Sequence, residues 1–169
     1  MTRPDSTEYA PEFEKYISLV PEGEIAATLG NQIESTLSLL GSLSEAQGNL
    51  RYAPGKWSVK EVIGHLIDGE RIFAYRALRF ARNDATPLSG FDENSFVANA
   101  GFDSRSLADL AEEFEYTRKS NIYLFKHLDG DSSLRRGAAN GNEISVRAIA
   151  YAIAGHELHH VGILRTRYL

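Results

Sequence analysis

Apolar residues recur every three or four positions along four stretches of the chain, a pattern typical of amphipathic helices. The first stretch follows the acidic segment 21–24 and carries its apolar positions at Ile25, Leu29, Ile33, Leu37, Leu40 and Leu43. The second opens on a capping box formed by Ser58 and Glu61 and runs to about residue 83. The third begins after Ser106, and the fourth spans about residues 145–168. Four helices of about 20 residues, each about 30 Å long, predict an all-α four-helix bundle in a single domain over residues 1–169.

Two connections interrupt this periodicity. Residues 83–105 form a long link between the second and third helices and contain Phe91, Phe96 and Phe102. So many aromatic residues in a loop indicate a packed flap, either a lid over a site or an interface with a partner chain. Residues 129–143 are polar and glycine-containing, with a weak signal for a small hairpin.

Composition narrows the range of functions. The chain has 18 basic and 23 acidic residues, a net charge of −5, which is the wrong sign for a general nucleic-acid binder. It has no cysteine, which excludes disulfides, iron–sulfur clusters and a thiol nucleophile of its own. The polar N-terminal segment lacks a signal-peptide profile, and no apolar stretch is long enough to cross a bilayer. We therefore expect a cytoplasmic protein with no membrane partner, in which any metal ion is held by histidines and carboxylates.

The most specific local motif is Gly155-His156-Glu157-Leu158-His159-His160. His156 and His160 are four residues apart on a predicted helix, so their Cβ atoms lie about 5–6 Å apart on one face. That spacing lets two imidazoles bind one ion, although two core histidines hydrogen-bonded to backbone or water remain an alternative. The segment also matches the H-E-x-x-H motif of metalloproteases. The extended form of that motif needs a glycine and a histidine where this chain has Ile163 and Thr166, so the third ligand is expected upstream.

His65 is the best candidate for that third ligand. It lies in the middle of the second predicted helix, on the flank of its apolar stripe. Gly64 and Gly69 thin the helix surface around it and would let another helix or a ligand approach. A lone helical histidine is more often structural, but the pair on the fourth helix reverses that balance. Three imidazoles leave coordination positions open for water or substrate, as in a catalytic site.

Other polar residues could assist. Asp68, one turn beyond His65, and Glu157, beside His156, are candidate catalytic or ligand-orienting carboxylates, and a plain salt bridge is an equal alternative for each. His159 is interpreted as a surface or supporting residue that replaces His160 if the helix is rotated. Four arginines make the second helix basic: either they bind an anionic substrate or, as we expect, they pair with nearby glutamates. They are Arg71, Arg76, Arg79 and Arg82.

The ordered set of motifs resembles the DinB/YfiT-like superfamily. The likeness rests on the segment 55–68 with its Trp57 and His65, on Glu70-Arg71, and on the terminal segment 155–160. The resemblance implies a four-helix bundle with a long crossover between helices 2 and 3. It also implies a divalent metal ion, nickel or zinc first and iron or manganese as alternatives, bound by His65, His156 and His160. Members of the family are commonly homodimers.

The resemblance leaves three functions open. The leading expectation is a metal-dependent enzyme acting on a small-molecule substrate, such as a transferase that activates a low-molecular-weight thiol. A hydrolase with a metal-activated water, in which Asp68 or Glu157 moves protons, is the close alternative. A stress-related metal-binding protein without catalysis is the third.

Overall fold

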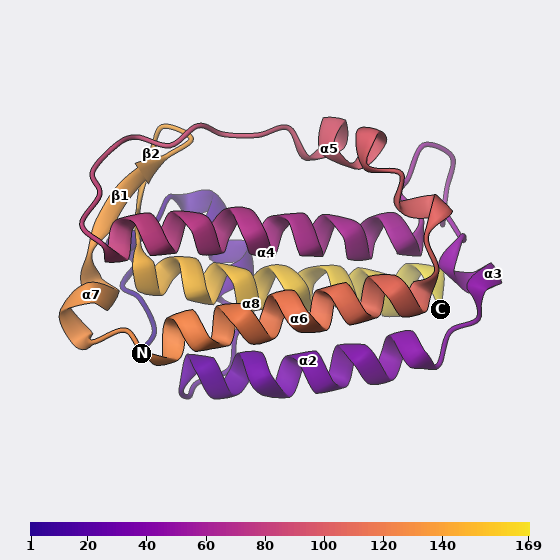
Figure 1. The fold of residues 1–169 in the computed structure, drawn as a ribbon, viewed down its shortest axis with the longest axis horizontal. Coiled ribbons are helices and arrows are strands. Elements are labelled where there is room, and N and C mark those ends of the chain that lie inside the picture. Colours follow the sequence, from indigo (N-terminus) through magenta and orange to yellow (C-terminus); the bar gives the residue numbers. More distant parts are fainter.

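The computed structural model describes residues 1–169, and four long helices that run along its longest axis confirm the predicted bundle (Figure 1). A π-helical turn over Leu164–Tyr168 continues the last of them. No helix in the structure combines the length and the apolarity needed to cross a bilayer. The four helices are α2 (Ile25–Gly41), α4 (Val59–Ala81), α6 (Leu107–Lys126) and α8 (Val146–Ile163).

Helices that follow one another along the chain are not always neighbours in the bundle. α4 packs against α6 and α8, and α2 packs against the same two helices. Because α2 and α4 are both flanked by α6 and α8, they occupy opposite corners of the bundle. The connection from α2 to α4, which includes the short helix α3 (Glu45–Gly48), therefore joins diagonal partners. This arrangement brings α4 and α8, the two helices with the candidate histidines, into direct contact.

Side chains at the N-termini of the long helices cap them at the residues that the sequence predicts. At α4 the Ser58 hydroxyl accepts a hydrogen bond from the Glu61 backbone N–H at 3.0 Å, and the Glu61 carboxylate accepts one from the Ser58 N–H at 2.8 Å. This is the predicted capping box, which satisfies amides left unpaired at a helix start. Ser106 and Ser145 cap α6 and α8 with a single bond each, because their hydroxyls accept from the backbone N–H groups of Asp109 and Ala148.

The crossover between α4 and α6 packs on its own chain. It contains the helix α5 (Glu93–Ala100) and a 3-10 turn at Phe102–Ser104, both in contact with α4. Phe102 lies directly on Gly64, where a Cβ atom would be 2.3 Å from the phenyl ring. The flap is therefore possible only because the residue before His65 has no side chain, which confirms the expected close approach at Gly64.

A hairpin closes one end of the bundle, after the short helix α7 (Gly130–Leu134). Strands β1 (Arg136–Ala139) and β2 (Asn142–Ser145) pair antiparallel, so the weakly signalled hairpin is present. Leu88 of the crossover adds to it, donating to the Ala138 carbonyl at 2.9 Å and accepting from the Asn140 N–H at 3.0 Å. These bonds tie the start of the flap to the hairpin.

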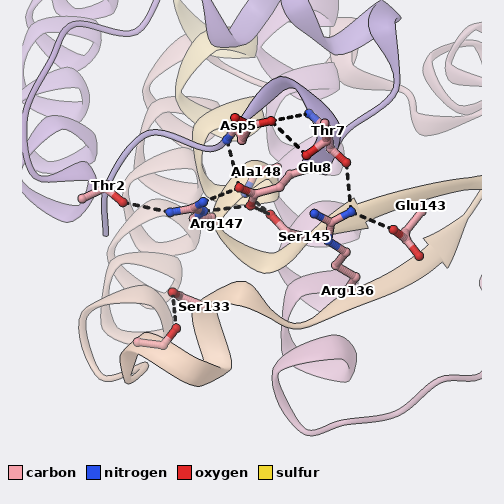
Figure 2. A network of polar contacts seen from close by, with 11 residues as sticks. Thr2, Asp5, Thr7, Glu8, Ser133, Arg136, Glu143, Ser145, Arg147 and Ala148 are labelled. Carbon is pink, nitrogen blue, oxygen red and sulfur yellow. Dashed lines mark hydrogen bonds and ion pairs between the residues drawn. The ribbon is translucent and has the colours of Figure 1, made fainter.

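The N-terminal segment, which the sequence pattern leaves undefined, folds back over α8. It forms 3-10 turns at Ser6–Glu8 and Pro11–Phe13, followed by the short helix α1 (Glu14–Ile17). The Glu8 carboxylate accepts hydrogen bonds from the Ser145 hydroxyl at 2.7 Å and from Arg147 Nε at 2.8 Å (Figure 2). This ion pair fixes the segment to the start of α8 and so positions α1, which packs against the same helix.

Candidate metal centre

Three histidines from two helices converge in the bundle. His65 comes from α4, and His156 and His160 come from successive turns of α8. One ring nitrogen from each lies within 4.8 Å of those of the other two, and the Nε2 atoms of His65 and His156 are 2.9 Å apart. The ring centroids are 4.6–4.9 Å apart in all three pairs. The structure thus brings together the three residues that sequence analysis selected as ligands.

Burial keeps all three imidazoles neutral. Desolvation lowers the pKa of His65 to about 4, against a small opposing effect of Glu93. Burial, together with the neighbouring His65 and His159, lowers the pKa of His160 to about 3. The pKa of His156 lies well below its usual range for the same reasons. At neutral pH each ring therefore has a free lone pair, which is the form of histidine that binds metals.

The donor set fits a divalent cation. Two imidazole nitrogens bound to one tetrahedral ion at about 2.0–2.1 Å are separated by about 3.3 Å. The observed separations, from 2.9 Å up to the 4.8 Å limit of the cluster, bracket that value. Apart from the contact between His65 and His156, the three rings make no hydrogen bond to protein groups. Three protein nitrogens also leave part of the coordination sphere open, as catalytic metal sites do.

Aromatic side chains from four segments surround the three histidines. Trp57 lies 4.8 Å from the His65 ring, Tyr16 of α1 lies 5.4 Å from that of His156, and Phe73 of α4 lies 6.1 Å from the same ring. Together with Phe13 and Phe91 they line a cavity of about 320 Å³, into which the three histidines point. The flap contributes Gly90, Phe91 and Glu93 to its wall. This arrangement supports the lid interpretation of the crossover.

Two small residues allow the helices to close on this site. Gly69 of α4 faces His156, where a Cβ atom would lie 3.3 Å from the ring, as expected from its position. Gly155 of α8 faces α1, where a Cβ atom would lie 2.0 Å from the Tyr16 carbonyl oxygen. A side chain at Gly155 would move Tyr16 and its ring away from the histidines, and a side chain at Gly69 would move the backbone of α4 away from His156.

Glu157 and Asp68, the two carboxylates considered for catalysis, do not line the cavity. Glu157 turns into the bundle core, where it accepts from Arg118 at 2.6 Å and from the Thr36 hydroxyl at 2.6 Å. Asp68 is half-buried outside the cavity lining, and burial raises its pKa against the opposing effect of Arg71. Of the roles considered for Glu157, the observed one is the pair with an arginine of another helix.

Arg118 is the centre of a buried ionic network that joins all four helices. Its guanidinium is fully buried and binds Glu70 of α4 as well as Glu157 of α8. Asn121 of α6 donates to the other Glu70 oxygen at 2.6 Å. Glu70 follows Gly69 and Glu157 follows His156, so the network holds α4 and α8 in register next to the metal centre. Such a network restricts alternative packings of the bundle.

Several cavity residues were not assigned to the site from sequence. Trp57 is predicted only as an N-terminal packing residue of α4, although its ring lies 4.8 Å from that of His65. Phe13 and Tyr16 belong to a segment without periodicity, so no sequence signal places them there. His159 also lines the cavity, with its ring 5.1 Å from that of His160, but it is outside the three-histidine cluster.

Comparisons with known proteins agree with this architecture. The family model of the DinB superfamily matches residues 28–164. Among solved structures, one match is YfiT from Bacillus subtilis, described as a probable metal-dependent hydrolase with an unusual four-helix bundle topology. The two chains are 16% identical and superpose with a TM-score of 0.68, over 96% of this chain and 91% of that chain. At this identity the likeness shows a common fold. No curated protein matches the chain.

Proposed function

The chain belongs to the DinB superfamily, and we propose that it is a metal-dependent enzyme whose three clustered histidines bind one divalent cation beside the cavity. The convergence of His65, His156 and His160, all neutral and all facing the same cavity, carries this proposal. When bound, such an ion polarises a substrate carbonyl or lowers the pKa of a water or thiol that it coordinates. Nickel and zinc are the first candidates, because imidazole suits both.

The side chains around the centre have distinct tasks. The aromatic residues of the wall, Trp57, Tyr16 and Phe73, exclude bulk water and hold the imidazole rings in place. Apart from the three clustered histidines, Glu12, Glu93 and His159 are the groups on the cavity wall that can accept a proton, since Asp68 and Glu157 lie outside it. Proton transfer is therefore assigned to this set of residues.

Hydrolysis of a small apolar substrate is the first candidate reaction. The description of YfiT as a probable metal-dependent hydrolase supports it, as does a cavity of about 320 Å³ that admits a compact molecule. Transfer of a low-molecular-weight thiol to an electrophile is the second. It is favoured by the lack of a carboxylate in contact with the three rings, because a thiol ionises more readily than water and needs less help from a base. The chain has no cysteine, so the thiol would be a cosubstrate.

One experiment separates the two reactions. The zinc- or nickel-loaded protein is incubated with a panel of aryl esters and amides without thiol, and with 1-chloro-2,4-dinitrobenzene in the presence and absence of a small thiol. His156→Ala removes a ligand, and His127→Ala, an exposed histidine on the far end of α6, is the matched control. Turnover without thiol that is lost only in His156→Ala supports hydrolysis, and conjugation that requires thiol supports transfer. If the loaded protein turns over neither class of substrate, the proposal of an enzyme is wrong.

A further inference from the structure

Arg76 differs from the other arginines of α4. Arg71 pairs with Glu113 at 2.5 Å, as expected, and Arg79 pairs with Asp84 instead of a glutamate. Arg76 is only 7% exposed and forms no ion pair. Its one hydrogen bond to protein is from Nη2 to the Ser89 carbonyl at 2.9 Å. A guanidinium has five N–H donors, so most of its donors have no protein partner.

These donors belong to the wall of the cavity that contains the metal centre. Arg76 is seven residues, or two helical turns, beyond Gly69, which faces His156. Two turns correspond to about 10 Å along the helix axis, and long helical side chains lean towards the helix N-terminus. The position of the guanidinium, 5.8 Å from the ring of Phe73 one turn earlier, agrees with that lean. Arg76 thus lies within the length of one small molecule from the three histidines.

Two aromatic rings lie next to the guanidinium of Arg76. Its guanidinium lies over the rings of Phe73 and Phe91, at 5.8 and 6.0 Å from their centroids. Desolvation lowers the pKa of Arg76, but an arginine remains charged under all physiological conditions. A buried charge without a counterion destabilises a fold. The two acidic residues of the cavity, Glu12 and Glu93, are both exposed and lie outside ion-pair distance of Arg76.

We infer that Arg76 binds the carboxylate of a small-molecule ligand whose apolar body lies along Phe73 and Phe91 and whose other end reaches the three histidines. This assignment rests on the proposed function, since it makes the ligand the substrate of the same site. The rings of Phe73 and Phe91 lie next to the guanidinium, most of whose N–H donors have no protein partner, and a planar carboxylate binds such donors through two parallel hydrogen bonds. One arginine balances the single charge of a carboxylate better than the larger charge of a phosphate monoester.

The test compares an acid with its neutral analogue on the metal-free protein. The probes are 4-phenylbutyrate and 4-phenylbutyramide, which have the same shape and differ in charge, and their affinities are measured by calorimetry after treatment with a chelator. The parent should prefer the acid by roughly ten-fold or more, the usual effect of a charged hydrogen bond. Arg76→Gln should abolish this preference. Arg82→Gln, which removes the same charge from the exposed residue that caps the C-terminus of the same helix, should keep it.

Two control measurements, of thermal stability and of metal content, accompany this test. Arg76→Met should melt at the same temperature as the parent or higher, because it removes an unpaired buried charge, and it should show no preference for the acid. The metal content of each variant should equal that of the parent. The inference is wrong if the parent protein binds the acid no more tightly than the amide, or if it binds neither probe. It is also wrong if Arg76→Gln retains the preference for the acid. A parent that binds no metal but shows the Arg76-dependent preference would instead refute the metal centre and leave this anion site standing.

Discussion

Gly155 is the position where the smallest change should have the largest effect on the site. A Cβ atom there would lie 2.0 Å from the carbonyl oxygen and 2.9 Å from the Cα atom of Tyr16. Since carbon atoms normally approach other heavy atoms no closer than about 3.5 Å, α1 must move away from α8 by more than 1 Å. The obstacle is backbone, which cannot change rotamer, so the cost should reach the upper end of the usual range for overpacking, about 3 kcal/mol. The shift would also withdraw the Tyr16 ring from His156 and His159.

The assay is thermal unfolding of Gly155→Ala followed by circular dichroism, with Gly30→Ala as the matched control. Gly30 lies within α2, and a Cβ atom at that position meets nothing within 4 Å. The same substitution there should stabilise the protein by about 0.5–1 kcal/mol, because alanine loses less backbone entropy in a helix. For a protein of this size, Gly155→Ala should lower Tm by roughly 6–12 °C while Gly30→Ala raises it by a few degrees. Equal or increased stability of Gly155→Ala would refute the described packing of α1.

Two further predictions concern the ion pairs that hold the helices and the N-terminal segment in place. Arg118→Met should destabilise the fold by about 3–5 kcal/mol in urea titrations, because it leaves the Glu70 and Glu157 carboxylates buried without a counterion; a loss below 1 kcal/mol would show that the network is hydrated. Glu8→Gln should cost about 2 kcal/mol at pH 7, since burial opposes the ionisation of Glu8 but hydrogen bonds from Arg147 and its other partners outweigh it and lower its pKa to about 2. Because the pKa is lower in the folded state, this contribution is complete above pH 4.5 and is lost as the pH falls towards 2, so the two proteins should converge in stability at acid pH. A stability difference that is undiminished at pH 2 would contradict the assignment.

The elements that local pattern specifies were predictable. Periodicity located the four long helices because each buries one continuous face, and Ser58 identified the start of α4 because a capping box is a local interaction. The three histidines of the cluster were predictable because local features of the sequence indicate them. The spacing of His156 and His160 places them on one helix face, and the glycines around His65 mark a close approach that the structure contains.

The remaining features depend on which segments meet in space. Tyr16 reaches the site through the Glu8–Arg147 ion pair, whose partners are 139 residues apart and carry no periodic signal. Glu157 is one residue from His156, which turns its side chain by about 100° around the helix and so directs it to Arg118 instead of the cavity. The four arginines at positions 71, 76, 79 and 82 look alike in the sequence, so the burial of Arg76 could not be predicted from it.

The central claim is tested most directly by the metal content of protein prepared without a polyhistidine tag. Elemental analysis should find about one divalent ion per chain. The ion should be lost from His65→Ala, His156→Ala and His160→Ala and retained by His127→Ala, whose histidine is exposed and remote from the cluster. A metal content well below one per chain that the three ligand substitutions leave unchanged would contradict the metal centre.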